Sequence, residues 1–297
     1  MNNPKILDIT YRLILPIASI LIVVFFVSQF ADLSFILSIQ GLCAFLIYSL
    51  LSLITGLRYI NFVGAITKKS PPASLSITLP ASMNLMSFVL PFKGGGIWLI
   101  FYLRQFHGIG VFKSSWLALV NSIMAACLII AMIGFPPTVD RGGYSLPLMV
   151  FMTTYFAIVL CALYVYNKTS ALDRTIGVRR ALLDTALSIV YILVLYSLVV
   201  IVVPDGTFHL QVGLVVLTIS SMAVKVTPGN VGIFEGLALL LMSIFPETGD
   251  RFVEYVATYR VLSLSHAIFF GLPSVLYLTD LRNMRRLLAG ADSAARQ

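Results

Sequence analysis

The sequence predicts an all-α polytopic membrane protein with about six full transmembrane helices plus two re-entrant helical hairpins in an inverted-topology repeat. The 297 residues are 59% hydrophobic and 11% charged, whereas a soluble domain carries roughly 25% charged residues. Two of the long apolar runs are broken in the middle by glycine and proline. Basic residues also fall almost entirely on one side of the resulting topology. These three observations together predict a single membrane domain.

Six apolar runs are long enough to cross about 30 Å of hydrocarbon as helices. They are Leu13–Phe30, Phe35–Gly56, Ser115–Ile133, Leu148–Val165, Leu182–Val203 and Val253–Leu278. The first run resembles a signal sequence, but its length and the lack of a small-x-small site after it predict an uncleaved span.

Two further apolar regions, Ser74–Leu103 and Leu210–Phe245, are interrupted at residues 91–96 and 227–232. Each half of such a region is too short to cross the bilayer comfortably. Irregular backbone at membrane depth is tolerated only where protein buries it or where it lines a polar cavity. We therefore predict two re-entrant hairpins, with one or two ordinary kinked spans in each region as the alternative.

The distribution of Lys and Arg tests this topology, because basic residues concentrate on the cytoplasmic side of a membrane. Six crossings with two hairpins place 15 basic residues on one face and two, Arg141 and Arg251, on the other. The 15 are Lys5, Arg12, Arg58, Lys68, Lys69, Arg104, Lys113, Lys168, Arg174, Arg179, Arg180, Arg282, Arg285, Arg286 and Arg296. The net charge of +8 is therefore explained by membrane orientation and predicts no nucleic-acid partner. We expect a multi-pass protein of the bacterial cytoplasmic (inner) membrane with both termini in the cytoplasm.

The order of elements predicts two halves, residues 1–140 and 141–297, joined by an external loop at about residues 134–145. Each half consists of two spans, a hairpin and a further span, and the second half enters the membrane from the opposite face. Paired interruptions in corresponding halves of a transporter point to its binding site. There is little residue identity between the halves, so the repeat depends on the pattern alone.

The two hairpin tips form the predicted substrate-binding site. A helix that stops and restarts exposes backbone N–H groups, and the helix dipole adds to their attraction for an anion such as phosphate. The predicted binding residues around the first tip are Asn84, Pro91, Lys93, Gly94, Gly95 and Gly96. Those around the second tip are Lys225, Thr227, Pro228, Gly229, Asn230 and Gly232. The alternative is that the glycines simply permit tight helix packing.

Glu235 is the only carboxylate that this topology places at membrane depth, since Asp184 and Glu254 fall at span ends. An ionisable residue inside the membrane is a functional candidate by default, and Arg260 and Lys225 are its available partners. Either Glu235 and Arg260 form a structural pair that pins the hairpin, or Glu235 titrates or contacts a lipid headgroup. We include Glu235 and Arg260 among the substrate-binding residues.

Three secondary candidates are Arg58, Arg104 and Asn121. The two arginines are expected at the cytoplasmic interface, where snorkelling to headgroups is the ordinary explanation and contact with a lipid phosphate is the functional one. Asn121, like Asn84, is a candidate for satisfying interrupted backbone groups. The three histidines share no ligand spacing, so we predict no metal, no cofactor and no catalytic residue.

The motifs resemble those of the lysylphosphatidylglycerol synthase transmembrane (flippase-like) family. Asn84 to Gly110, with its N-x6-P-x-K-x-G pattern, resembles the first block of that family, and residues 227–236 (TPGNVGIFEG) are similar to the block S-P-G-G-x-G-x-x-E-G. Tyr259-Arg260 matches a tyrosine-arginine pair in the last span. The resemblance implies a helical bundle with two re-entrant hairpins, in which Pro228, Gly229, Gly232, Glu235 and Arg260 are functional.

This chain departs from the family at Gly95-Gly96, where a glutamate is usual, and at Asn121, where an arginine or a Glu-Arg pair is usual. The first half-site lacks the usual charge pair, so the resemblance does not fix a lysyl lipid as the substrate. We expect a stand-alone member without the synthase domain.

The leading hypothesis is a lipid translocase, which moves an aminoacylated phospholipid or a polyprenyl-linked glycan between leaflets. The alternatives are an integral-membrane enzyme and an accessory subunit of a lipid-modifying synthase or glycosyltransferase. Catalysis would need clustered acids, bases or metal ligands, whereas Glu235 is the one acid expected at depth. The predicted partner is a membrane lipid with an anionic headgroup. The lipid, the energy source and the oligomeric state are left open.

Overall fold

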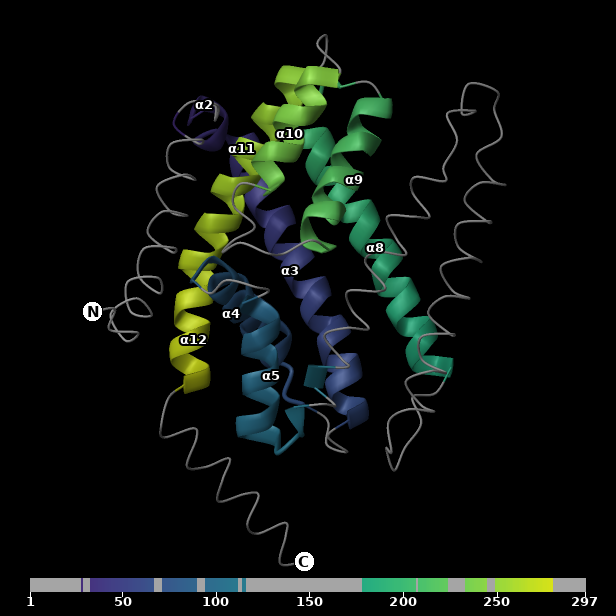
Figure 1. Ribbon diagram of the computed structural model, residues 1–297, viewed down its shortest axis with the longest axis vertical. Helices are drawn as coiled ribbons and strands as arrows, with labels where there is room; N and C mark the ends of the chain where they lie inside the picture. The colour runs from purple at the N-terminus through teal and green to yellow at the C-terminus, as the bar shows by residue number, and fades with distance from the viewer. Residues whose placement is uncertain are drawn as a thin grey trace, which may run out of the picture.

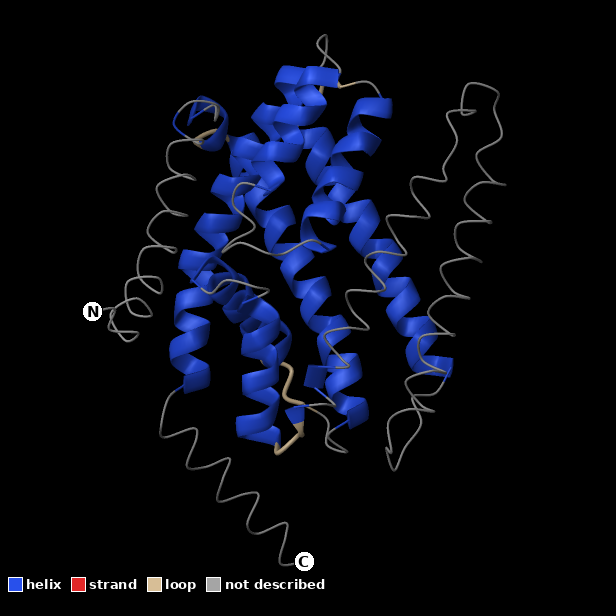
Figure 2. Cartoon of the chain, viewed as in Figure 1, coloured by secondary structure: helices blue, strands red, loops and turns tan. Residues whose placement is uncertain are grey.

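The computed structural model describes residues 28, 33–66, 71–89, 94–111, 114–115, 178–206, 208–223, 233–244 and 249–279. Within these ranges every regular element is a helix, and Figure 2 shows them as a bundle without strands. The helices are α2 (Leu33–Ile36), α3 (Ile39–Ile66), α4 (Leu75–Val89), α5 (Gly94–His107), α8 (Val178–Val202), α9 (Phe208–Ala223), α10 (Ile233–Ile244), α11 (Gly249–His266), the π-helix η3 (Ala267–Gly271) and α12 (Leu272–Thr279). The predicted all-α class is confirmed for the part of the chain that the structure describes.

Within the described ranges, three helical stretches are long and apolar enough to cross a membrane: Ile39–Asn61, Leu182–Val202 and Asp250–Thr279. They coincide with the second, fifth and last of the predicted spans. The third stretch is built from α11, η3 and α12, which follow one another without a break in the helical path. The other three predicted spans fall almost entirely outside the described residues.

Two pairs of shorter helices pack between the long ones. An α-helix rises 1.5 Å per residue. The first pair, α4 with 15 residues and α5 with 14, therefore extends about 22 Å and about 21 Å. The second pair, α9 with 16 residues and α10 with 12, extends about 24 Å and about 18 Å. Each is therefore shorter than the ~30 Å hydrocarbon core. Figure 1 shows α4 and α5 in the lower part of the bundle and α9 and α10 in the upper part, while α3 runs past both pairs.

The α4–α5 pair is joined by close side-chain and backbone contacts. The indole N–H of Trp98 on α5 donates to the Ser82 hydroxyl on α4 at 2.9 Å. A glycine, Gly56, lets α3 approach α4 so closely that a Cβ there would overlap the Ser76 backbone carbonyl. Close backbone approach through small residues is the usual way in which membrane helices pack.

The interior and exterior of the bundle are both apolar. Leu79, Leu99, Leu195 and Leu214 are fully buried, while the outward-facing surface carries large hydrophobic side chains. Examples of these exposed residues are Leu46 at 58%, Leu193 at 60%, Phe269 at 69% and Leu276 at 63%. So broad an apolar exterior suits lipid rather than water.

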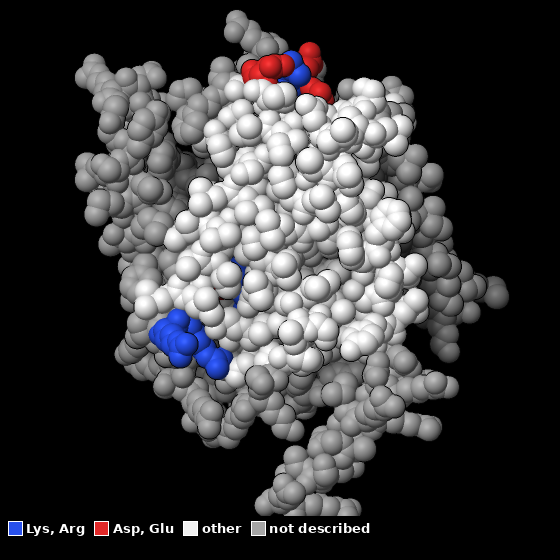
Figure 3. Space-filling model, turned by 180° about the vertical axis from the view of Figure 1, so that it is seen from behind, with Lys and Arg blue, Asp and Glu red and all other residues white. Residues whose placement is uncertain are grey.

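The charged residues of the described surface separate along the bundle axis. Arg179 and Arg180 lie at the start of α8, and Asp250 and Glu254 lie in the first turns of α11. Figure 3 shows an acidic cluster, with a basic group within it, at the upper end of the molecule and a basic patch near the lower end; the surface between them is white apart from one small recessed blue spot. This is the distribution of a protein whose middle part is in lipid.

Candidate functional site

A buried ion pair between Glu235 and Arg260 occupies the centre of the candidate site. The Arg260 Nε donates to Glu235 Oε1 at 2.6 Å, and the Arg260 Nη2 donates to Glu235 Oε2 at 3.2 Å. The side chains are 4% (Arg260) and 6% (Glu235) exposed. The guanidinium carbon of Arg260 also lies 5.1 Å from the centre of the Phe234 ring. Of the two predicted partners, Arg260 thus pairs with Glu235, and Lys225 lies outside the described residues.

The position of Glu235 in the chain favours this pair. It lies in the first turn of α10, where a carboxylate complements the positive end of the helix dipole. Arg260 lies in the second half of α11, which packs against α10. Removing one member of a buried pair leaves an uncompensated charge and typically costs 3–5 kcal/mol. The geometry suits a structural pin and a ligand-exchange site equally, so the two predicted roles of the pair stay open.

Asn84 of the first hairpin region reaches the same core. Its side-chain amide donates to the backbone carbonyl of Ser263 at 3.3 Å, which joins α4 to α11. The hydroxyl of Tyr48, on α3, interacts with the side chains of Ser263, Tyr259 and Asn84, and it lies in the electrostatic field of Arg260. Residues predicted separately for the two halves of the chain therefore meet in one polar cluster.

Aromatic rings surround this cluster. The Tyr259 ring lies edge-on to Tyr48 at 5.4 Å and to Phe234 at 5.6 Å. The neighbouring Tyr255 is fully buried, and its hydroxyl lies 2.9 Å from the Thr218 hydroxyl on α9. Tyrosine rings thus enclose the site, with the Tyr48 hydroxyl interacting with Tyr259 and the Tyr255 hydroxyl with Thr218.

Tyr48 and His266, whose rings pack against each other, also belong to this site, although neither was predicted from the sequence. A signal was present in the last span, where Tyr255, Tyr259, Ser263 and His266 follow one another at intervals of four, four and three residues. This spacing places them on one face of a helix. It is a polar stripe in a strongly apolar segment.

At the first tip, the central glycine, Gly95, packs closely against helix α4. Gly94, Gly95 and Gly96 begin α5, and the Gly95 N–H donates to the Ser87 hydroxyl on α4 at 3.2 Å. A Cβ at Gly95 would lie 2.6 Å from the Met83 carbonyl oxygen and from the Ser87 Oγ. At this position the packing interpretation is favoured, and the Gly95 amide is already engaged by a protein acceptor.

Several predicted site residues lie outside the described residues. They are Pro91, Lys93, Asn121, Lys225, Thr227, Pro228, Gly229, Asn230 and Gly232. Their assignment to the binding site stays a prediction from the sequence.

Arg58 and Asp184 lie near the ends of the apolar stretches Ile39–Asn61 and Leu182–Val202, which agrees with their predicted positions at span ends. Their pairing was not predicted: Arg58 was expected to snorkel to headgroups, but it forms a second ion pair with Asp184, between α3 and α8. Their N–O distances are 3.0 Å from Nε to Oδ1 and 3.4 Å from Nη2 to Oδ2, and their side chains are 12% and 0% exposed. Both charges lie inside helices, because α3 continues ten residues past Gly56 to Ile66 and α8 already begins at Val178. Arg104, in contrast, is exposed near the end of α5.

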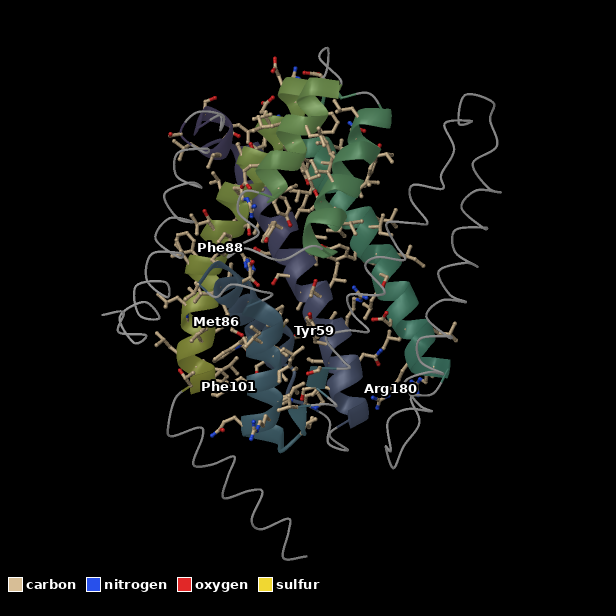
Figure 4. The ribbon with its side chains drawn as sticks, viewed as in Figure 1. Tyr59, Met86, Phe88, Phe101 and Arg180 are labelled. Carbon is tan, nitrogen blue, oxygen red and sulfur yellow. The ribbon has the colours of Figure 1, made fainter. Side chains whose placement is uncertain are left out.

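A reciprocal contact reinforces α3 against α8 at the lower end of the bundle. The Asn61 amide donates to the Arg180 carbonyl at 3.0 Å, and Arg180 Nη1 donates to the Asn61 carbonyl at 2.8 Å. Figure 4 shows Arg180 at this end, beside the lower part of α3 that carries Tyr59. The α3–α8 pair is thereby fastened by two sets of polar contacts.

Among the described residues, no three His, Cys, Asp or Glu side chains come together as a potential metal site. Comparison with protein-family models, with curated proteins and with solved structures finds no match to this chain. The family resemblance therefore depends on the quoted motifs, and functional conclusions have to be argued from the site itself.

Proposed function

We propose that this protein is a flippase-like translocase that moves a phosphate-bearing lipid between the leaflets of a bacterial cytoplasmic membrane. The lipid is an aminoacylated phospholipid or a polyprenyl-linked glycan. The observation that carries the proposal is the Glu235–Arg260 pair, which is enclosed in the core beside Asn84 and Tyr48 of the other half of the chain. A charge pair in this environment costs desolvation free energy, and functional sites are where membrane proteins retain such groups.

The short helices support a binding site half-way through the membrane. If α4–α5 and α9–α10 are re-entrant hairpins, each pair enters from one face and turns back at depth, which suits their lengths of 12 to 16 residues. Their opposite placement in Figure 1 agrees with an inverted repeat of six spans and two hairpins. The half-sites would then face each other across the Glu235–Arg260 pair.

Arg260 is the residue that we assign to phosphate recognition. A guanidinium donates two parallel hydrogen bonds to a phosphate as readily as to a carboxylate. In the observed state Glu235 accepts those two bonds, so a lipid phosphate would take its place. Exchange of one anion for another keeps Arg260 paired throughout, while the displaced Glu235 carboxylate leaves one negative charge of the core without a counter-charge. The lipid tails stay in the bilayer, against the apolar exterior of the bundle.

The charge distribution supports an orientation. The end that carries Arg104, Arg179 and Arg180 is the cytoplasmic one by the positive-inside tendency. The end with Asp250 and Glu254 then faces the opposite side (Figure 3).

The test is a leaflet assay with purified protein in liposomes. Fluorescent phosphatidylglycerol, an aminoacylated phosphatidylglycerol and a polyprenyl phosphate are each placed in both leaflets, and a membrane-impermeant quencher reports their exchange. The wild-type protein is expected to accelerate the exchange of at least one of these lipids. Arg260→Ala and Glu235→Gln are expected to abolish that acceleration.

The matched control is Arg251→Ala, a substitution in the same helix. Arg251 forms an exposed pair with Glu254 at 3.2 Å, with side chains 47% and 36% exposed. This variant should transport like the wild type. Exchange no faster than in protein-free liposomes for all three lipids, or full activity of both core variants, would overturn the proposed function.

A further inference from the structure

His266, the last residue of α11, is a buried ionisable residue for which the translocation scheme has so far no role. It is 3% exposed, and its Nδ1 has no hydrogen-bond partner among the described residues. Nearly all buried polar side-chain atoms in proteins have a partner. An unpaired imidazole nitrogen in an apolar core is an open acceptor for a proton.

Aromatic rings enclose the imidazole on several sides. The Phe270 ring centre lies 5.0 Å away, the Tyr48 ring meets it edge-on at 5.4 Å, and the Phe45 ring is at 6.5 Å. Aromatic faces attract a cation, and the attraction is stronger where water is excluded. The surroundings therefore partly offset the cost of an imidazolium.

In the core, the helices packed around His266 carry no free carboxylate among the described residues that would balance the cost of a charged imidazolium. On α3 the facing group is Tyr48; α4 has no ionisable residue and contributes Asn84. On α11 itself the nearest titratable residues along the chain are Tyr259 and Arg260, seven and six positions before His266. The described carboxylates of the core, Glu235 and Asp184, are each held by an arginine. From η3 through α12 the titratable side chain is Tyr277, which is exposed.

Tyr48 connects His266 to the Arg260 site. Its ring packs against both His266 and Tyr259, and its hydroxyl interacts with Asn84, Ser263 and Tyr259. The π-helix that follows His266 directly is in backbone contact with α4, because a Cβ at Gly271 would lie 2.7 Å from the Ala81 carbonyl oxygen. π-Helical turns are frequent at functional sites. His266 is therefore connected through Tyr48 to the Arg260 site and through η3 to α4.

The net charge of the core indicates a role for the Nδ1 of His266. Glu235 and Arg260 sum to zero, so a phosphodiester monoanion that enters beside them brings one uncompensated negative charge into a low-dielectric interior. Such a charge is costly unless another group neutralises it. We propose that His266 binds a proton when the anionic headgroup enters, so that lipid and proton move together. This inference rests on the proposed translocase function and supplies its coupling ion.

Calorimetry of ligand binding tests the proposal. Dioctanoyl phosphatidylglycerol is titrated into the solubilised full-length protein near neutral pH in two buffers that differ in ionisation enthalpy, and the difference in heat reports the number of protons taken up. We expect about one proton per lipid for the wild type and about none for His266→Gln. His209→Gln is the matched control and should keep the wild-type value. Dimethyl phosphate, a phosphodiester monoanion without tails, separates recognition of a free phosphate from that of a lipid.

The outcomes distinguish this inference from the function on which it rests. Lipid binding without proton uptake in the wild type, or with undiminished uptake in His266→Gln, overturns the proton site and leaves the translocase intact. If neither probe binds, the phosphate site itself fails, and the proton site that depends on it fails with it. A second measurement observes His266 directly: the ¹⁵N spectrum of a His107→Gln/His209→Gln variant, in which His266 is the remaining imidazole, recorded near neutral pH with and without dioctanoyl phosphatidylglycerol. Conversion of His266 to the imidazolium form on addition of the lipid supports the proposal, and an unchanged protonation state overturns it.

Discussion

Replacing Asp184 by asparagine should strongly destabilise the protein, although Asp184 lies outside the candidate binding site. The substitution keeps the size and shape of the side chain but removes its charge. Arg58 is then left 12% exposed with no carboxylate on α8 to accept its Nε and Nη2 hydrogen bonds. We expect a loss of about 3–5 kcal/mol in the free energy of unfolding, the usual cost of breaking a buried pair by removing one partner.

The double variant Arg58→Met/Asp184→Leu separates this effect from simple loss of contact. A buried ion pair is roughly balanced by its desolvation cost, so well-packed apolar residues in its place are often neutral or stabilising by about 1–4 kcal/mol. The double variant should therefore recover most or all of the stability that Asp184→Asn loses. In addition, Glu254→Gln breaks the exposed Arg251–Glu254 pair and should cost no more than about 1 kcal/mol.

The measurement is unfolding of the purified protein in mixed micelles with increasing denaturing detergent, followed by helical circular dichroism for all four proteins under the same conditions. A loss in Asp184→Asn no larger than that in Glu254→Gln would refute the buried α3–α8 pair. A double variant as unstable as the single one would show that the charge imbalance is not the cause.

Two further predictions concern the first short hairpin and the orientation. Gly95→Ala places a methyl group against the Met83 carbonyl oxygen and should destabilise the α4–α5 pair by about 1–3 kcal/mol in the same unfolding assay. Gly236→Ala is the control, because a Cβ at Gly236 would meet nothing within 4 Å, and it should not destabilise the protein. Equal effects of the two substitutions would contradict the packing role of Gly95. In a background with Cys43, Cys127 and Cys161 replaced, an impermeant thiol reagent added to intact cells should label Asp250→Cys and not Arg104→Cys. Labelling of both from outside would contradict the proposed orientation.

The sequence identified those features that depend on local composition. The spans at Phe35–Gly56, Leu182–Val203 and Val253–Leu278 were predictable because a helix in lipid needs a long apolar run, and this requirement is visible residue by residue. Glu235 was conspicuous for the same reason, since a carboxylate within such a run needs a partner. Arg260 was named as a partner because a core charge has very few complements to choose from.

The tertiary structure decided which distant faces meet. Arg58 and Asp184 are 126 residues apart and Asn84 and Ser263 are 179 apart, and nothing in the hydropathy of either segment predicts these contacts. It also decided that the Gly95 amide is engaged by Ser87 and that the Nδ1 of His266 is enclosed without a described partner. Hydropathy is a sum over one segment, whereas a side-chain contact depends on the rotation and crossing of two helices, which only their mutual packing determines.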